Sequence, residues 1–204
     1  MKKVVLLGDS IRLWGYGTPV EEALKNEFEV WQPTENCRFA QYTLRGLFDW
    51  RKEIEGADII HWNNGLWDIC ELFGDGPFTP KEQFVEEMVR LATIMKQRAK
   101  VVIFATMTPV RKENIYNKNE VIAAYNDAVV PRLRELGVEI NDLYTPISQD
   151  IERYISTDLI HLSDEGVRLC TDMVESAIRK AADRLTEKND RTNAPATDAQ
   201  GAPV

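Results

Sequence analysis

The chain has 204 residues, 44% of them hydrophobic, which suits one globular domain with a sizeable core. Acidic residues outnumber basic ones by 33 to 25, and the formal net charge of −8 argues against a nucleic-acid partner and against anionic membranes. The three widely spaced cysteines indicate neither a disulfide framework nor a thiolate zinc site, and we expect no bound metal.

The amino terminus places a charged pair of lysines before a short apolar run, Val4 to Leu7. This run is too short for the apolar core of a signal peptide, because Gly8 and Asp9 interrupt it. No other stretch approaches the length of a membrane span. We therefore expect a cytoplasmic location and no membrane partner.

Short apolar segments recur along the chain, and longer amphipathic stretches separate them. The predicted strands are residues 3–7, 29–31, 58–62, 101–105 and 138–140. Such alternation is typical of βαβ units. The fourth segment is apolar throughout, which indicates a parallel strand that is covered on both faces.

Two amphipathic stretches predict helices over residues 80–98 and 119–136. Thr79 is the expected N-cap of the first helix, with Pro80 at its first position. Gly137 is the expected C-cap of the second helix.

Ser163 is expected to open the last helix, whose apolar positions suit packing on a sheet as far as about Leu185. The sequence from 187 to 204 is polar and lacks large apolar residues. We therefore predict one domain over residues 1–186, followed by a disordered tail over 187–204.

Gly8-Asp9-Ser10 directly follows the first predicted strand. Open α/β sheets build their ligand sites at the carboxyl ends of strands, so this serine is well placed for chemistry. Alone the tripeptide is weak evidence, because a serine after a strand is often the N-cap of the next helix. A serine hydroxyl also needs a base to become a nucleophile, and histidine is the usual base.

The chain has two histidines. His61 lies inside a predicted strand, where we expect an imidazole that is hydrogen-bonded within the protein. His161 lies in a polar approach to the last helix, where a loop can aim it at a strand end. Asp158 could orient that imidazole as the acid of a triad does, or it could cap a turn that leaves His161 exposed.

Gly8-Asp9-Ser10 and Asp158-Leu159-Ile160-His161 resemble the first block and the DxxH block of the SGNH or GDSL hydrolase superfamily. Both lie where that family has them, so the resemblance spans nearly the whole folded chain. Thr108-Pro109 and Tyr125-Asn126 add further matches. The resemblance implies a flavodoxin-like three-layer α/β/α sandwich around a central five-stranded, mostly parallel sheet. It also implies a Ser10, His161 and Asp158 triad that hydrolyses esters through an acyl-enzyme, without a cofactor.

The family's oxyanion hole combines the backbone N–H of the nucleophile, here Ser10, with a glycine N–H from the second block and an asparagine side chain from the third. The second block of this chain, residues 34–43, has no glycine. Matching the Tyr-Thr end of that block without gaps puts Asn36 in its place, with Cys37 as the alternative. Any non-proline residue can supply a backbone donor, so Asn36 is the expected second donor.

The third block reads Asn63-Asn64-Gly65-Leu66-Trp67-Asp68, which puts Trp67 where the family has its asparagine. An indole does not replace a carboxamide in reach and geometry. Asn64, with Asn63 as the alternative, is therefore the expected third donor.

Trp67 and Asp9 are the residues that we assign to the substrate, because an indole beside a catalytic serine suits the apolar face of a sugar ring. Arg12, Arg38 and Arg111 could each bind a carboxylate or hydroxyl groups, or be an ordinary surface cation. The Asn-Asn-Gly third block is similar to that of small carbohydrate esterases, so an O-acetyl sugar is the leading substrate class. The alternatives are a lipase or thioesterase for longer acyl chains and a non-catalytic carbohydrate-binding protein; the oligomeric state is left open.

Overall fold

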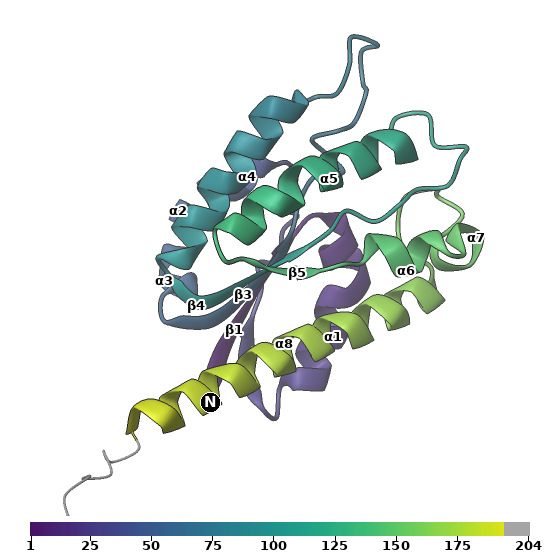
Figure 1. Cartoon of the computed structure of the whole chain (residues 1–204). Helices are drawn as coiled ribbons and strands as arrows, with labels where there is room; N and C mark the ends of the chain where they lie inside the picture. Colours follow the sequence, from purple (N-terminus) through teal and green to yellow (C-terminus); the bar gives the residue numbers. More distant parts are fainter. Residues whose placement is uncertain (194–204) are drawn as a thin grey trace, which may run out of the picture.

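Five parallel strands form the central sheet, in the order β2-β1-β3-β4-β5 (Figure 1). The structure is a computed structural model that describes the backbone of residues 1–193 and the side chains of residues 1–187. The strands are β1 (Lys2–Gly8), β2 (Phe28–Trp31), β3 (Ala57–Asn63), β4 (Ala99–Ala105) and β5 (Glu139–Asn141). All four neighbouring pairs are parallel, and the order is that of flavodoxin-like folds, as predicted.

Strands β1 and β3 are almost entirely buried, which explains why apolar residues predominate in both. Their register pairs Gly8 with Asn63, so β1 and β3 end side by side. In flavodoxin-like sheets the connections diverge between these two strands, which is where such folds place their ligands. The indole of Trp62 packs against Phe104 on β4, with ring centroids 4.9 Å apart.

Helices cover both faces of the sheet and give the predicted three layers (Figure 1). One layer contains η1 (Arg12–Tyr16), α1 (Gly17–Leu24) and α8 (Asp164–Asn193). The other contains α2 (Ala40–Asp49), α3 (Arg51–Ile54), α4 (Lys81–Lys96) and α5 (Asn119–Glu135). Two short helices, α6 (Tyr144–Ser148) and α7 (Ile151–Tyr154), connect β5 to α8.

The start of α4 differs by one residue from the prediction. Pro80 is the N-cap itself, and α4 begins at Lys81. The hydroxyl of Thr79 donates instead to Asp68, at 3.0 Å. The prediction was wrong because a buried carboxylate, which sequence spacing does not reveal, binds the hydroxyl. At the end of α5 the C-cap is Leu136 rather than the predicted Gly137; Gly137 comes one residue later, in the left-handed conformation that ends many helices.

The last helix begins as predicted and ends later. Ser163 Oγ accepts the backbone N–H of Gly166 at 3.1 Å, which is the hydrogen bond of an N-cap. The helix then continues to Asn193, so the predicted disorder is wrong for residues 187–193. That stretch is polar, but its glutamate, lysine and arginine residues are good helix formers. Residues 194–204 of the predicted tail lie outside the described residues.

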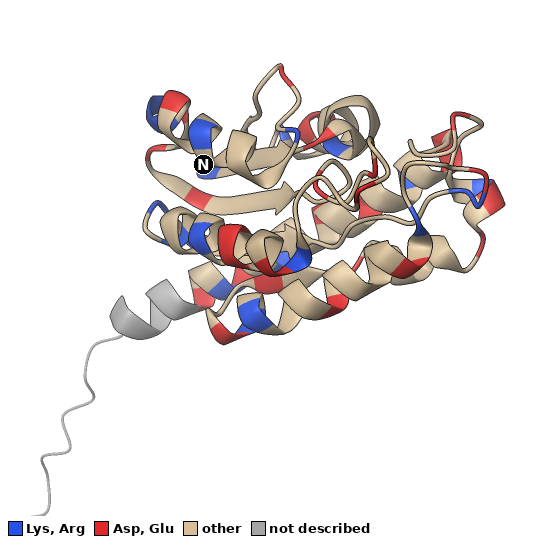
Figure 2. Cartoon of the chain, turned by 90° about the horizontal axis from the view of Figure 1, so that it is seen from above, with Lys and Arg blue, Asp and Glu red and all other residues tan. Residues whose placement is uncertain are grey.

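Acidic and basic residues are interspersed over the outer helices rather than gathered on one basic face (Figure 2). Within residues 1–193, none of the helices combines the length and the apolar character that crossing a bilayer requires.

Candidate active site

Ser10 lies where β1 turns into a helix, and Asp9 rather than Ser10 caps that helix. Asp9 Oδ1 accepts the backbone N–H of Ile11 at 2.9 Å, and the Asp9 carbonyl accepts that of Leu13 at 3.0 Å. Ser10 is the first helical residue, and its own N–H has no hydrogen bond among the described residues. This N–H therefore lies at the positive end of the helix dipole, free to bind an anionic oxygen.

Asp9 is only 1% exposed, which corrects its assignment to the substrate. Its Oδ1 also accepts a 2.7 Å hydrogen bond from Asn63 Nδ2, and its Oδ2 has no partner within the described part of the chain. Burial raises the pKa of Asp9 to about 6, against the lowering effects of the Ile11 and Asn63 hydrogen bonds and of the charges on Arg12 and His161. Asp9 therefore shapes the turn that presents Ser10 and does not face solvent.

Asp158 and His161 form a hydrogen-bonded pair on the turn that precedes α8. Asp158 Oδ2 lies 2.7 Å from His161 Nδ1. Asp158 Oδ1 accepts the Ser156 hydroxyl at 2.7 Å and the backbone N–H groups of Ile160 and His161 at 3.1 and 2.9 Å. Partial burial raises the pKa of Asp158, but these hydrogen bonds outweigh it and hold the pKa well below its usual range. A proton on Nδ1, bonded to the ionised carboxylate, leaves Nε2 of the ring as a base.

The turn of His161 packs against the helix that begins at Ser10. The ring of His161 meets the edge of the Trp14 indole, with centroids 5.0 Å apart, and α8 packs on η1. Ser10 Oγ and the His161 ring are not hydrogen-bonded to each other in the described structure. Catalytic hydrogen bonds commonly tighten when substrate binds, so the geometry is compatible with a triad.

His61 is fully buried, and its Nε2 lies 3.2 Å from Asn141 Nδ2. Burial lowers the pKa of His61 to about 3, so its ring is neutral. The expected structural role of this histidine agrees with these contacts.

The second block is tied to the end of β1. The backbone N–H of Cys37 donates to the Gly8 carbonyl at 3.1 Å, and the Gly8 N–H donates to the Cys37 thiol at 3.3 Å. The N–H of Cys37 is therefore occupied, whereas the N–H of Asn36 has no hydrogen bond among the described residues. The left-handed conformation that favours glycine falls at Arg38, whose φ is +50°.

The side chains of Asn64 and Asn63 are both held within the protein, which corrects the expected oxyanion role of Asn64 and its alternative. Asn64 is fully buried; its Nδ2 donates to the Arg38 carbonyl at 2.8 Å, and its Oδ1 accepts the Thr43 hydroxyl at 3.0 Å. Asn63 binds Asp9 as described above. Both carboxamides therefore brace the loops around the site instead of facing a substrate.

Trp67 lines an apolar cleft of about 340 Å³ beside the Asp158–His161 turn. The other lining residues are Phe39, Leu66, Cys70, Leu72, Phe78, Asn117 and Ile160. Asn117 is the one polar amide among them, and its Nδ2 is engaged by the Leu66 carbonyl at 2.8 Å. The sequence pointed to Trp67 but not to the other lining residues, because they come from separate loops and share no periodicity.

No family model matches the chain. A curated protein, the GDSL esterase/lipase CPRD49 of Arabidopsis thaliana, is 23% identical over 210 residues, which cover 88% of this chain and 79% of that protein. Among solved structures, the lipase/acylhydrolase from Enterococcus faecalis has a TM-score of 0.76 at 18% identity, covering 88% of this chain and 96% of its own. The acetyl xylan esterase AlAXEase has a TM-score of 0.69 at 21% identity, and the match covers 86% of this chain and 99% of that esterase chain.

The sequence match, the shared fold and the two motif blocks agree with one another. Gly8-Asp9-Ser10 ends β1, and the Asp158–His161 pair directly precedes the last helix. The chain is thus similar in sequence to a GDSL esterase/lipase and has the fold of the lipase/acylhydrolase from Enterococcus faecalis.

Proposed function

We propose that this protein is a serine ester hydrolase, with Ser10 as the nucleophile, His161 as the base and Asp158 as the acid that orients it. The observation that supports this most strongly is the 2.7 Å contact between His161 Nδ1 and an ionised Asp158, on a turn packed against the helix of Ser10. An imidazole held in this tautomer is suited to remove a proton from a neighbouring hydroxyl.

In the proposed reaction, His161 Nε2 takes the proton of Ser10 as Ser10 Oγ attacks the ester carbonyl carbon. His161 then returns the proton to the leaving alcohol, and the acyl group stays on Ser10. Water, deprotonated by His161, then attacks the acyl carbon; the bond to Ser10 Oγ breaks, His161 returns the proton to Ser10 Oγ, and the carboxylic acid leaves. The free backbone N–H groups of Ser10 and Asn36 are the proposed donors to the oxyanion.

The leading substrate is a short acyl ester, an O-acetyl group on a carbohydrate or similar small molecule. The similarity in fold to the acetyl xylan esterase AlAXEase supports this choice. The position of Trp67 supports it too, because an indole next to the triad turn can stack on a sugar ring. The proposed site of action in the cell remains the cytoplasm.

An ester with a longer acyl chain is the second candidate, and the apolar cleft favours it. A sugar needs partners for its hydroxyl groups, whereas the amide of Asn117 is already bonded to the Leu66 carbonyl. Each methylene buried in the cleft would add about 0.8 kcal/mol of binding free energy. Rates on p-nitrophenyl acetate and octanoate separate the candidates: a steep loss with chain length supports the acetyl ester, and a falling KM supports the longer chain.

The Ser10→Ala variant tests the nucleophile. We expect it to abolish p-nitrophenyl acetate hydrolysis while the circular dichroism spectrum stays that of the wild type. A fluorophosphonate should label the wild type and not the variant. Full activity of the variant would refute the assignment. Absence of labelling in a folded wild-type sample would instead support a non-catalytic carbohydrate-binding protein.

A further inference from the structure

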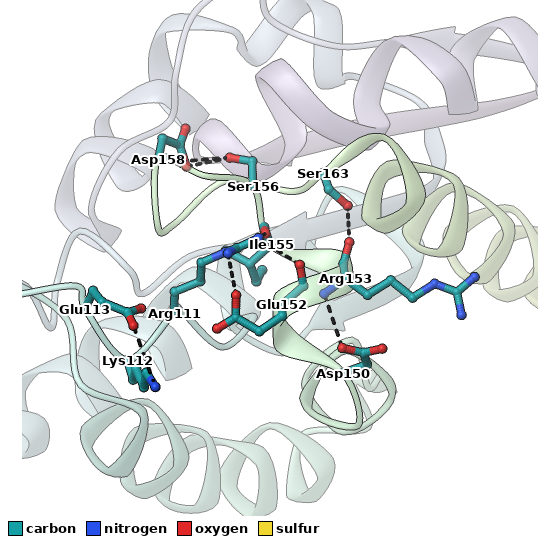
Figure 3. A network of polar contacts seen from close by, with 10 residues as sticks. All are labelled: Arg111, Lys112, Glu113, Asp150, Glu152, Arg153, Ile155, Ser156, Asp158 and Ser163. Carbon is teal, nitrogen blue, oxygen red and sulfur yellow. Dashed lines mark hydrogen bonds and ion pairs between the residues drawn. The ribbon is translucent and has the colours of Figure 1, made fainter.

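The side chain of Arg111 joins the loop after β4 to the segment that leads into the Asp158–His161 turn (Figure 3). Its Nε and Nη2 donate to the Ile155 carbonyl at 2.8 and 2.6 Å, and Nη2 also donates to the Glu152 carbonyl at 2.7 Å. Its Nη1 pairs with the Glu152 carboxylate. The side chain of Arg111 is only 18% exposed, so its donors face the protein rather than a substrate or bulk water.

These bonds complete the end of helix α7. A helix leaves its last carbonyls without partners in the chain's own helical pattern, and α7 is a single turn. Arg111 takes two of the carbonyls there. Ser163 binds the other two carbonyls: its hydroxyl donates to the Arg153 carbonyl at 2.6 Å, and its backbone N–H donates to the Tyr154 carbonyl at 2.8 Å. The turn of residues 156–161 therefore begins and ends at segments that Arg111 and Ser163 hold in place.

Arg111 also holds the middle of that turn. Its backbone N–H donates to the Leu159 carbonyl at 3.0 Å. Leu159 has a φ of +78°, a left-handed conformation that costs a residue with a side chain about 1–2 kcal/mol. This conformation lies between Asp158 and His161, and the turn keeps it only while surrounding contacts outweigh the cost.

We propose that Arg111 is a positioning residue, whose guanidinium holds the turn so that Asp158 and His161 keep the geometry needed for proton transfer from Ser10. The proposal rests on the proposed function of this site. It excludes both roles that the sequence left open for Arg111, because its donors are bound to carbonyls and to Glu152. Lysine cannot replace it, since one ammonium on a flexible stem does not reproduce a planar fork of donors.

The test compares Arg111→Lys with Arg153→Lys. Arg153 belongs to α7, the helix whose carbonyls Arg111 binds, but the side chain of Arg153 is 57% exposed and pairs with Glu165 at the surface. We expect Arg111→Lys to lower kcat for p-nitrophenyl acetate about 10- to 100-fold with KM changed less than about twofold, as a displaced catalytic group does. Arg153→Lys should keep both constants within about twofold, because exposed ion pairs contribute little.

Glu152→Gln separates the ion pair from the carbonyl contacts. It removes the charge that faces Arg111 Nη1 but leaves the bonds to the two backbone carbonyls. We expect its kcat to stay within about twofold of the wild type. Loss of activity in Glu152→Gln equal to that in Arg111→Lys would overturn the role given to the carbonyl contacts.

A second readout does not depend on activity. The Nδ1 proton of His161, bonded to Asp158, should give a low-field proton NMR signal that His161→Gln removes; His61 Nδ1 has no partner in the described residues. We expect Arg111→Lys to weaken this signal while the circular dichroism spectrum stays that of the wild type. If the Arg111→Lys variant does not fold, the Arg111→Gln variant is measured in its place. An unchanged signal and unchanged kcat would overturn the proposal. An inactive wild type that keeps the Arg111-dependent signal would refute the proposed function alone.

Discussion

Asn63 Nδ2 donates a 2.7 Å hydrogen bond to Asp9 Oδ1, so the end of β3 holds the residue that precedes the proposed nucleophile. Asn63 Oδ1 in turn accepts the hydroxyl of Tyr16 at 2.7 Å. Gly8 makes this contact possible, because a Cβ there would stand 2.1 Å from Asn63 Oδ1. The glycine of the motif thus leaves room for the carboxamide that fixes its aspartate.

The buried carboxyl of Asp9 should make stability depend on pH. Its pKa is about 6 in the folded protein against an ordinary 3.8, because burial disfavours the charged form. Well below pH 3.8, Asp9 is protonated in both the folded and the unfolded state, so its burial does not lower the free energy of unfolding through ionisation. As the pH rises from 3.8 to about 6, the unfolded state loses this proton before the folded state does, so the free energy of unfolding falls, by up to about 3 kcal/mol once Asp9 is ionised in both states above about pH 6.

The Asp9→Asn variant isolates this effect, because its side chain does not titrate. Its free energy of unfolding, measured in urea relative to the wild type, should rise by up to about 3 kcal/mol between about pH 4 and pH 8. Asp68, whose pKa burial raises to about 7, is present in both proteins, so the effect of its burial is common to both; only the smaller effect of the Asp9 charge on Asp68 differs between them. A difference that does not change with pH would contradict the prediction.

The sequence was sufficient to predict the sheet and the two motif blocks. A parallel strand that is covered on both faces is mostly apolar, and the five predicted segments fall on the five observed strands within two residues at each end. Ser10, Asp158 and His161 could be named because each follows or precedes such an element at a recognisable spacing. Pattern and local order were enough for these features.

The sequence did not show where side chains point at the ends of strands. Asn63 and Asn64 are adjacent, yet one bonds to Asp9 and the other to the second block. Which loop each one meets depends on the strand order and on loop packing. The role of Arg111 was hidden for the same reason, because the carbonyls that it binds belong to Glu152 and Ile155, in and directly after α7, far along the chain from Arg111.

Trp67 should contribute to binding of apolar esters through the cleft. Its side chain lies at the rim, with the residue 43% exposed, so Trp67→Ala removes contact area with little effect on the core. We expect kcat/KM for p-nitrophenyl octanoate to fall about 10-fold or more, at about 25 cal/mol per Å² of apolar surface lost, and to fall less for the acetate. Phe73→Ala is the matched control, because Phe73 is 81% exposed and does not line the cleft. Equal losses in both variants would speak against a specific role of Trp67.

The three cysteines should differ in reactivity. Cys37 and Cys170 are buried, and burial raises their pKa values to about 11 and about 12. Cys70 is half-buried and lines the cleft, and burial also raises its pKa. Because the thiolate is the reactive form and needs access to the reagent, Ellman's reagent should modify Cys70 slowly and the other two only after unfolding.

Protection of Cys70 then reports on occupation of the cleft. Octanoate bound there should slow the modification of Cys70, whereas acetate at the same concentration should not. The Cys70→Ser variant identifies the reacting thiol. Equal rates with and without octanoate would show that the cleft does not take an alkyl chain.

Gly65 should be the most sensitive position of the third block. It has a φ of +134°, and a Cβ added there would stand 2.2 Å from Met107 Sδ. Gly65→Ala therefore combines backbone strain with overpacking, which typically costs about 1–3 kcal/mol in addition. Gly76 is the matched control, because its φ of +112° carries backbone strain while a Cβ there meets nothing within 4 Å.

Urea unfolding of Gly65→Ala, Gly76→Ala and the double variant Gly65→Ala/Met107→Ala separates the two contributions. We expect Gly65→Ala to lose more free energy of unfolding than Gly76→Ala. In the Met107→Ala background, Gly65→Ala should lower the free energy of unfolding only about as much as Gly76→Ala does in the wild type. The shortened side chain at position 107 no longer meets the new Cβ. An undiminished cost in the Met107→Ala background would mean that backbone strain alone, rather than contact with the loop after β4, requires a glycine beside Asn64.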